Sequence, residues 1–405
     1  MNLTSPESVG LSTDRLNRIA SHFNTYVDDG RLPGYTVMIA RGGEPAYFYK
    51  YGLCDIEAGK PIEEDTIFRI YSMTKPITSV GLMMLYEQGR FQLDDPVSHY
   101  LPKFSDLTVF KDGDENDFTT TPAECEITIR HLLTHTSGLS YGFMNNSPVD
   151  AIYRKHVVGG ATANRTTETF VDKIAELPLL FSPGEKWSYS VATDVLGRLI
   201  EVLSGQSLDV YFHDQILAPL GMLETAFSVP SGSESRFAAN YQRSKNGFEL
   251  FDAPETSPYL VPPAMLSGGG GLVSTTGDYF RFCQMLLNRG ELDGVRLLGR
   301  KTVDYMTANH LPNGGDLTSM GQAVFSETRF DGVGFGLGFS IMLDPVKAQV
   351  LGSSGEYAWG GAASTGFWVD PAEDMIGIFM TQLMPSAAYA IRRELRVLAY
   401  QSIVD

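Results

Sequence analysis

The sequence predicts an α/β fold of the α+β type, in which one antiparallel sheet is built from both ends of the chain and covered by helices. Short strand-like runs with turn signals between them occur over residues 35–51 and again over residues 335–382. Helical spacing of apolar residues dominates the middle of the chain. We therefore expect residues 1–75 and 265–405 to form a sheet subdomain and residues 76–264 to form a mainly helical subdomain.

The composition and net charge of the chain limit the classes of protein to which it can belong. The chain has 405 residues, of which 43% are hydrophobic and 20% are charged, as in an ordinary globular protein. The net charge is -17 and no basic patch stands out, so neither nucleic acid nor a membrane is expected as a partner. The sequence does not begin with a signal-peptide pattern, and the three scattered cysteines (Cys54, Cys125 and Cys283) suit free thiols. These features predict a cytoplasmic protein.

The N-terminal region begins with an amphipathic helix. Ser12 is a suitable N-cap, apolar residues follow at helical spacing, and Gly30 ends the pattern. Two strands are predicted next, at residues 35–40 and 45–51. The sequence Arg-Gly-Gly-Glu at residues 41–44 is a hairpin signal between them.

A serine and a lysine stand at the start of the next helix. A short apolar strand at residues 66–70 leads into a helical pattern that ends before Gly89. Pro76 has no backbone donor and fits only the first helical turn, which places the helix start close to Ser72. The Cβ atoms of Ser72 and Lys75 should then lie roughly 5–6 Å apart on one face. Such a pair can act as nucleophile and base, but on spacing alone a capping serine with a solvated lysine is the commoner arrangement.

Along the rest of the chain, the predicted secondary structure changes from mainly helical to rich in strands. Residues 91–260 are mainly helical and irregular, with the clearest helix predicted at residues 191–203, before Gly205. A glycine run at residues 268–271 precedes a short strand and a helix near residues 279–287. Strands are then predicted at residues 335–343, 355–360, 364–369 and 375–382, and a closing helix carries Ile391, Leu395 and Leu398. Residues 370–374 should form the last hairpin turn.

Two further segments could complete a serine site. Residues 181–190 precede a helix and present Tyr189 on a loop, where a phenol could transfer protons. Residues 356–362 suggest a strand around Trp359, whose glycines Gly360 and Gly361 would let a ligand approach the backbone. Taken separately, Tyr189 and Trp359 are more often packing aromatics.

Together, in this order, the three segments resemble the serine β-lactamase and penicillin-binding-protein superfamily, and most closely the family VIII carboxylesterases, which are relatives of class C β-lactamases. The similarity extends from about Leu11 to the final helix. It includes Leu93-Asp94-Asp95-Pro96-Val97, the run from Ile127 to Leu139, and Pro183-Gly184 before Tyr189. The resemblance implies a β-lactamase/transpeptidase-like fold.

The resemblance also implies roles by position. Ser72 matches the acylated nucleophile, Lys75 its helix partner, and Tyr189 the tyrosine that exchanges protons with the serine and the leaving group. The segment Trp359-Gly360-Gly361 matches the Trp-x-Gly of the family and is expected to contact substrate. The backbone amides of Ser72 and Ala362 match the oxyanion hole. The implied activity is that of a serine carboxylesterase, which acts on a small-molecule ester through an acyl-enzyme on Ser72 and needs no cofactor.

Two departures from β-lactamases point to neutral substrates. Trp359 stands where β-lactamases carry the lysine of Lys-Thr-Gly, which helps to hold the carboxylate of the antibiotic. Tyr189-Ser190-Val191 replaces the Tyr-x-Asn of class C enzymes. We therefore expect short-chain, neutral carboxylic esters as substrates and weak β-lactam turnover. Aromatic residues near the motifs, including Tyr141 and Trp187, are expected to line an apolar substrate pocket.

Three other functions stay open at this stage. Some members of the family pass the acyl group to an alcohol instead of water, and the motifs do not distinguish these acceptors. A β-lactamase or DD-peptidase is a second alternative, weakened by Trp359. A non-catalytic, penicillin-binding-like scaffold is a third, and the joint presence of Ser72, Lys75 and Tyr189 argues against it.

Four other patterns suggest chemistry but lack features that it requires. Gly138-Leu139-Ser140-Tyr141-Gly142 fits a nucleophile elbow, yet a helix instead of a strand is predicted before it. His131 and His135 have the spacing of zinc ligands without the required glutamate, so hydrogen bonding at a helix end is expected. Asp112, Asp114 and Asn116 have calcium-loop spacing without its glycine. The glycines at 268–271 lack a P-loop lysine and predict a tight turn, so no metal site is expected.

Overall fold

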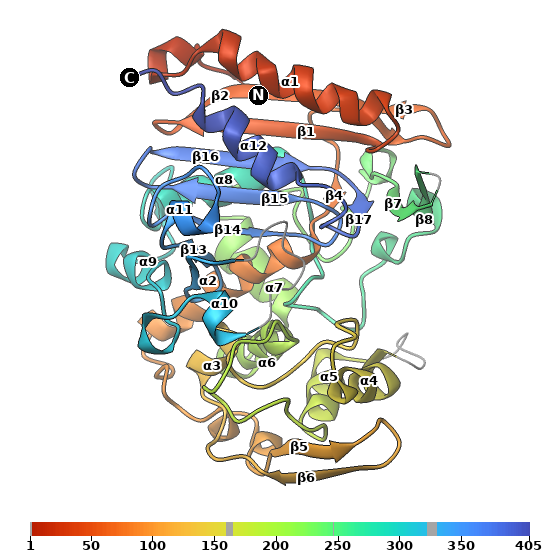
Figure 1. Cartoon of the computed structure of the whole chain (residues 1–405), viewed down its shortest axis with the longest axis vertical. Coiled ribbons are helices and arrows are strands. Elements are labelled where there is room, and N and C mark those ends of the chain that lie inside the picture. The colour runs from red at the N-terminus through yellow and green to blue at the C-terminus, as the bar shows by residue number, and fades with distance from the viewer. Residues whose placement is uncertain (1, 159–164, 246, 322–329) are drawn as a thin grey trace.

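The two ends of the chain meet in one antiparallel sheet, as predicted. The computed structural model describes residues 2–158, 165–245, 247–321 and 330–405 (Figure 1). Strands β1 (Gly34–Arg41) and β2 (Glu44–Asp55) form the N-terminal hairpin. Strand β16 (Met375–Met380) lies beside β1, with Val37 opposite Phe379. The N-terminal hairpin and the C-terminal strands therefore share backbone hydrogen bonds.

The main sheet has eight strands within the described residues, in the order β12-β13-β14-β15-β16-β1-β2-β3. A turn at residues 370–374 joins β15 to β16, as predicted, and Asp374 adopts φ 49° within it. The other strands are β3 (Lys60–Pro61), β12 (Val333–Phe335), β13 (Ser340–Met342), β14 (Tyr357–Gly360) and β15 (Gly366–Asp370).

Helices cover both faces of this sheet. α1 (Thr13–Asp28) and α12 (Ile391–Tyr400) pack against each other, and they contact β2 and β16 respectively (Figure 1). The predicted N-cap of α1 is confirmed, because the Ser12 side chain accepts from the amide of Arg15. α8 (Thr276–Leu287) packs against β15 and β16 from the other side. Each face therefore has its own hydrophobic core.

Helix α2 (Thr74–Glu87) lies between the sheet and the helices of the middle of the chain (Figure 1). It is buried along most of its length and packs against α6 (Ala192–Ser204), which ends at Gly205 as predicted. Within the described ranges, no helix combines the length and the apolar character needed to cross a membrane. The other helices are α3 (Ile129–Leu133), α4 (Pro148–Tyr153), α5 (Thr167–Ile174), α7 (Leu208–Phe212), α9 (Arg300–Met306), α10 (Leu317–Met320) and α11 (Pro345–Ala348).

Smaller sheets tie loops together. β4 (Phe68–Arg69) pairs with β9 (Val273–Ser274), which joins the segment before Ser72 to the segment after the glycine run. Many side chains of β5, β6 and β8 face solvent, so these strands lack the alternation on which strand prediction depends. The small sheets that the sequence does not predict are β5 (Thr108–Gly113) with β6 (Phe118–Pro122), β10 (Glu291–Leu292) with β11 (Val295–Arg296), and β17 (Leu383–Met384) with β7 (Asn240–Ser244) and β8 (Gly247–Asp252).

Two predicted strands are wrong in extent. Residues 335–343 do not form one strand, because a tight turn separates β12 from β13. In this turn the Gly336 amide donates to the Phe339 carbonyl at 2.8 Å, and Gly338 adopts φ 100°, a conformation that favours glycine. The strand predicted at residues 66–70 consists only of Phe68–Arg69, since the backbone turns at Tyr71.

Candidate active site

Ser72 lies in a turn at the start of α2. The chain leaves β4, makes a 3-10 turn over Tyr71–Met73 and then enters α2. Tyr71 adopts φ 42°, a left-handed conformation that is rare outside glycine. Its hydroxyl accepts from Nδ2 of Asn240 at 2.9 Å, which helps to hold the turn. Pro76 lies in the first turn of α2, as predicted, and the positive end of the helix dipole there favours negative charge near Ser72.

The structure brings Lys75 and Tyr189 to Ser72. The Tyr189 hydroxyl lies 2.6 Å from Ser72 Oγ, and Lys75 Nζ lies 3.3 Å from the same oxygen. Lys75 Nζ is also 4.6 Å from the centre of the Tyr189 ring. Lys75 is 2% exposed and Tyr189 is 6% exposed, so both groups are shielded from bulk water. A hydroxyl, an amine and a phenol can therefore exchange protons at hydrogen-bonding distance.

A buried carboxylate balances the charge of Lys75. Lys75 Nζ donates to the Gly269 carbonyl at 2.6 Å and to the Tyr141 hydroxyl at 3.0 Å. Asp194 Oδ1 accepts from the Gly269 amide at 3.0 Å and from Ser267 Oγ at 2.6 Å. Burial raises the pKa of Asp194, and the Lys75 cation and these hydrogen bonds oppose that rise. Asp194 therefore acts on Lys75 through its charge and through the peptide of Gly269.

Asp194 was not predicted as a site residue, although the sequence carries a signal for it. It is a carboxylate among the apolar residues that begin α6, shortly after Tyr189. The tight turn predicted for the glycine run is confirmed, because the Gly271 amide donates to the Ser267 carbonyl at 2.9 Å. A Cβ on Gly269 would lie 2.6 Å from Asp194 Oδ2, so this approach requires glycine.

The β14–β15 hairpin meets the nucleophile turn at Gly361. A Cβ on Gly361 would lie 2.4 Å from the Ile70 carbonyl oxygen, so a larger residue would push the hairpin away from the residues before Ser72. Ala362 follows directly and lines the same cavity as Ser72. The backbone of this hairpin and the start of α2 can therefore approach one bound group from two sides.

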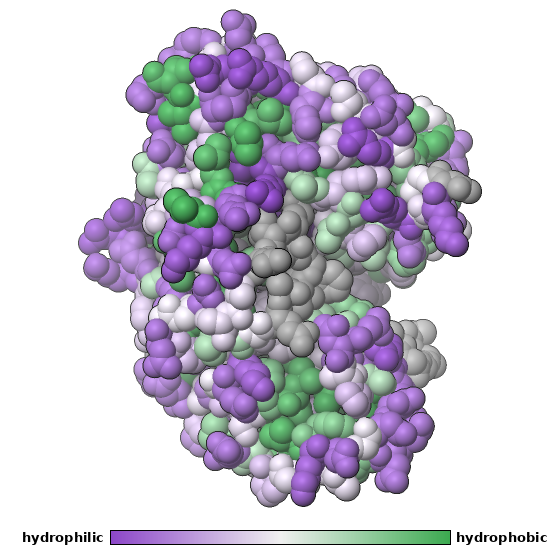
Figure 2. Space-filling view, in the orientation of Figure 1, coloured by the Kyte–Doolittle hydropathy of each residue, from purple (hydrophilic) through white to green (hydrophobic). Residues whose placement is uncertain are grey.

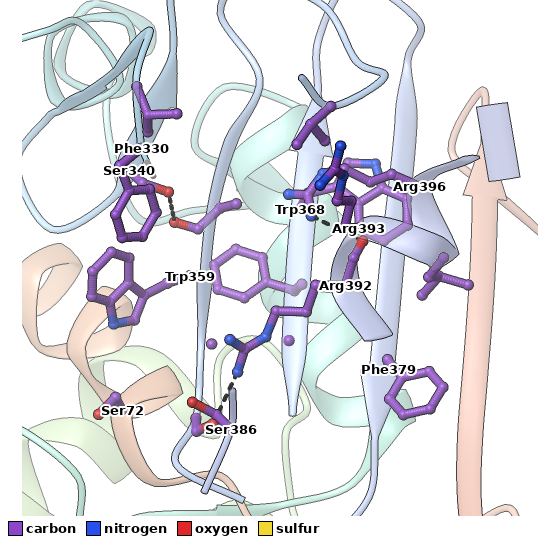
Figure 3. A pocket seen from close by; sticks show the side chains of 18 of the residues that line it. Ser72, Phe330, Ser340, Trp359, Trp368, Phe379, Ser386, Arg392, Arg393 and Arg396 are labelled. Atoms are coloured by element: carbon purple, nitrogen blue, oxygen red, sulfur yellow. Dashed lines mark hydrogen bonds between the residues drawn. The ribbon is translucent and has the colours of Figure 1, made fainter. Parts of the chain in front are cut away.

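A mostly apolar cavity of about 540 Å³ opens beside Ser72. This size is typical of a small-molecule site. Figure 3 shows the Trp359 ring between Ser72 and Phe330 in the view, and the Trp359 and Tyr189 rings lie 5.5 Å apart between centroids. Gly360 and Gly361 also line the cavity, as does Arg392 of α12, which the sequence patterns did not indicate.

Two aromatic residues predicted to contact substrate lie elsewhere. Tyr141 stands behind the nucleophile and accepts from Lys75, while its neighbour Phe143 lines the cavity and is 49% exposed. Trp187 is 2% exposed and stacks behind Tyr189 with ring centroids 6.4 Å apart. The prediction that Tyr141 and Trp187 line the pocket is therefore not matched by the cavity wall, because the loop before α6 turns Trp187 inward.

The other serine and histidine patterns have structural explanations. Ser140 is fully buried, follows α3 instead of a strand, and donates to Asp150 Oδ1 at 2.5 Å. His131 forms the capping box of α3 with Thr128, as expected for hydrogen bonding at a helix end. His135 lies against Tyr189 with ring centroids 5.1 Å apart, and burial holds its pKa well below the ordinary value.

The acidic loop with calcium-loop spacing is a turn in which a carboxylate accepts hydrogen bonds from nearby backbone amides. Asp114 Oδ1 accepts from the amides of Asn116 and Asp117 in the turn between β5 and β6. In the part of the chain that the structure describes, no group of three or more His, Cys, Asp or Glu side chains is placed to hold a metal ion.

Comparisons with known proteins show the family to which the chain belongs. Residues 19–401 match the family model described as Beta-lactamase. Protein Rv1367c of Mycobacterium tuberculosis is 35% identical over 361 residues, which are 88% of each chain. Esterase EstB of Burkholderia gladioli is 32% identical over 384 residues, which cover 90% of this chain and 89% of that protein. The structure of EstCE1, described as a hydrolase with promiscuous acyltransferase activity, superposes with a TM-score of 0.77 at 26% identity and covers 98% of this chain and 99% of its own. The chain therefore belongs to the Beta-lactamase family.

Proposed function

We propose that this protein is a serine carboxylesterase that hydrolyses short-chain, neutral carboxylic esters through an acyl-enzyme on Ser72. The observation that carries the proposal is the contact of the Ser72 hydroxyl with both Tyr189 and Lys75. The similarity to esterase EstB supports the reaction class.

The first step forms the bond between Ser72 Oγ and the ester carbonyl carbon. With the Lys75–Tyr189 pair in its basic form, the hydrogen bond runs from Ser72 to Tyr189, and the pair takes the serine proton as the bond forms. The same proton then passes to the alkoxide of the leaving alcohol. Because the two groups share one proton, the base belongs to the pair and not to either residue. In the second step the pair takes a proton from a water molecule as that water attacks the acyl carbonyl carbon. The proton then returns to Ser72 Oγ as the acid is released.

The negative charge that develops on the oxygen of the tetrahedral intermediate is stabilised by two hydrogen-bond donors in the proposed mechanism. The backbone amides of Ser72 and Ala362 are the proposed donors, and each such donor is typically worth about 3–4 kcal/mol in the transition state. The close contact of Gly361 with the Ile70 carbonyl supports this pairing, because it holds the hairpin against the nucleophile turn.

The preference for neutral esters rests on the cavity wall. Trp359 presents an aromatic surface beside Ser72 at the position where the antibiotic-hydrolysing relatives carry a lysine. Three arginines of α12 line this cavity, namely Arg392, Arg393 and Arg396. Arg392 donates to backbone carbonyls, and Arg396 pairs with the buried Glu356. The proposed substrates are therefore uncharged at the acyl end.

Acyl transfer to an alcohol is a second candidate function. The description of EstCE1 as a hydrolase with promiscuous acyltransferase activity favours it. Both activities share the first half of the reaction and differ only in whether water or an alcohol resolves the acyl-enzyme. Adding a soluble alcohol during turnover and measuring the transesterified product separates the two.

A panel of p-nitrophenyl esters of increasing acyl length, with nitrocefin alongside, tests the proposal. We expect the highest kcat/KM with short acyl chains, little nitrocefin turnover, and no turnover above background with Ser72→Ala. Efficient nitrocefin hydrolysis would contradict the proposed substrate class. Ester hydrolysis that survives in Ser72→Ala would contradict the proposed nucleophile.

A further inference from the structure

Three side chains on one face of α12 fasten this helix to the β14–β15 hairpin. Arg392, Arg396 and Tyr400 are spaced by four residues, so they lie along one side of the helix. Arg396 pairs with Glu356, directly before β14, at 2.7 Å. The Tyr400 hydroxyl contacts Glu356 Oε2 at 2.9 Å and Asp370 Oδ2, at the far end of β15, at 2.7 Å. Arg392 makes the third attachment, at the end of the hairpin that faces Ser72.

The guanidinium of Arg392 fits a slot between two glycines. Gly360 and Gly366 are register partners on β14 and β15. A Cβ on Gly360 would lie 2.4 Å from Arg392 Nη2, and a Cβ on Gly366 would lie 2.9 Å from Arg392 Nε. Side chains at these two positions would therefore fill the space that the guanidinium occupies.

From this slot Arg392 donates to both sides of the loop that carries Ala362. Arg392 Nη2 lies 3.0 Å from the Gly361 carbonyl and 2.7 Å from the Thr365 carbonyl, and Nε lies 3.2 Å from the latter. These carbonyls belong to the residues on either side of the segment 362–364. The planar fork of arginine suits two acceptors at fixed positions, which a lysine could not hold in the same way.

A second set of contacts holds the loop from β17. Ser364 Oγ donates to the Leu383 carbonyl at 2.7 Å, and the Leu383 amide donates to the Ala363 carbonyl at 3.1 Å. The Ala362 peptide therefore lies between an anchor on α12 and an anchor on β17. The Gly361 carbonyl and the Ala362 amide belong to one planar peptide unit, so the contact of Arg392 with that carbonyl restrains the direction of the amide.

We propose that Arg392 is a positioning residue for the oxyanion hole, which fixes the Ala362 amide by holding the Gly361 and Thr365 carbonyls. The inference rests on the proposed function, since it assigns a role only if Ala362 stabilises a tetrahedral oxygen. A displacement of about 1 Å in a catalytic donor can lower a rate roughly 100-fold. Loss of the Arg392 contacts should therefore lower kcat about 10- to 100-fold, with KM changed less than threefold.

Arg392→Gln is the first test, and Arg15→Gln is its matched control, because it removes an arginine of α1 that also donates to a backbone carbonyl, that of Gln401 directly after α12, but is not among the residues that line the cavity. Assays are run well below the melting temperature of each variant. We expect Arg392→Gln to lower kcat and to weaken inhibition by phenylboronic acid by a similar factor, since its tetrahedral adduct on Ser72 would use the same donors. Arg15→Gln should keep wild-type values. A role confined to stability would lower the melting temperature without moving either readout, and that result would overturn the inference.

Gly366→Ala provides an independent test that keeps the arginine. The added methyl group would displace the guanidinium, because the nearest atoms to it are Nε, Cδ and Cγ of Arg392. We expect Gly366→Ala to reproduce the loss seen in Arg392→Gln and the double variant to be no slower than either single variant. Fully additive losses would contradict the shared mechanism.

Ser72→Ala is measured in parallel, so that failure of the proposed function can be distinguished from failure of this inference. Ester hydrolysis that survives in Ser72→Ala refutes the proposed function. An inactive Ser72→Ala together with a fully active Arg392→Gln refutes only the role of Arg392.

Discussion

The hydroxyl of Tyr189 lies 2.6 Å from Ser72 Oγ, although 117 positions separate the two residues in the sequence. Tyr189 is 6% exposed and its ring is held between Trp187, His135 and Trp359, so the phenol has little freedom to leave this contact. Most proposed chemistry of the site depends on it.

Removal of the Tyr189 hydroxyl should slow the reaction without unfolding the protein. We expect Tyr189→Phe to lower kcat for a p-nitrophenyl ester by about 10²–10⁴-fold, the usual contribution of a general acid–base group, with KM little changed. Steady-state kinetics and a melting curve check this. A loss confined to KM would show that the phenol binds substrate instead of moving protons.

Asp194 should matter through its charge and not through its shape. Asp194→Asn keeps an acceptor for Ser267 Oγ and the Gly269 amide but removes the negative charge that balances Lys75. We expect kcat to fall about 10- to 100-fold with KM little changed, because the positive charge that the Lys75–Tyr189 pair carries in the transition state is less well stabilised. Asp278→Asn, which neutralises a buried carboxylate that contacts Thr225, serves as a control and should leave kcat near its wild-type value. A wild-type kcat in Asp194→Asn would contradict the electrostatic role.

Trp359 should decide between neutral and anionic substrates. Trp359→Lys removes aromatic surface from the cavity and introduces a cation beside Ser72. We expect the ratio of kcat/KM for nitrocefin to that for a short p-nitrophenyl ester to rise about 10- to 100-fold, the discrimination expected from one hydrogen bond to a charged group. Trp359→Phe, which keeps an aromatic ring, should leave the ratio near its wild-type value. An unchanged ratio in Trp359→Lys would show that another part of the site discriminates between neutral and anionic substrates.

His135 should make the protein less stable in mild acid. Burial, and then the Lys75 cation, hold the pKa of His135 well below 6.5 in the folded state. Below pH 6.5 the unfolded chain therefore binds a proton that the folded chain does not, and the free energy of unfolding falls as the pH falls. One such histidine contributes a slope of up to about 1.4 kcal/mol per pH unit.

The variant His135→Asn tests this slope, because asparagine tolerates the φ of 56° found at this position. Burial also lowers the pKa of His131 and His310, so the variant should reduce the slope between pH 7 and pH 5 without abolishing it. Urea denaturation at several pH values measures the slope. An identical slope in the variant would contradict the assignment.

Local periodicity was enough to predict part of the site. The three-residue spacing of Ser72 and Lys75 at a helix start places both on one face, and Pro76 fixes where that helix begins. The strands at the two ends of the chain are also short, mostly apolar runs bounded by turn signals, so the sheet was predictable. Tyr189 and the Trp359 segment came from the family resemblance and not from spacing, because no local rule links them to Ser72.

Contacts between distant elements could not be predicted in this way. Asp194 reaches Lys75 only through the peptide of Gly269, and Arg392 reaches the hairpin only because α12 crosses it. The turn at Gly338 was missed because its neighbours continue an apolar run that suggests one strand. Trp187 was placed in the pocket by sequence proximity alone, whereas packing behind Tyr189 decided its position.

The most direct test of the central claim is to label the protein with a fluorophosphonate and map the modified residue by mass spectrometry. We predict a single adduct on Ser72, complete loss of ester hydrolysis when it forms, and no adduct on the Ser72→Ala variant. An adduct on another side chain that abolishes activity, or full ester hydrolysis after Ser72 has been modified, would contradict the account.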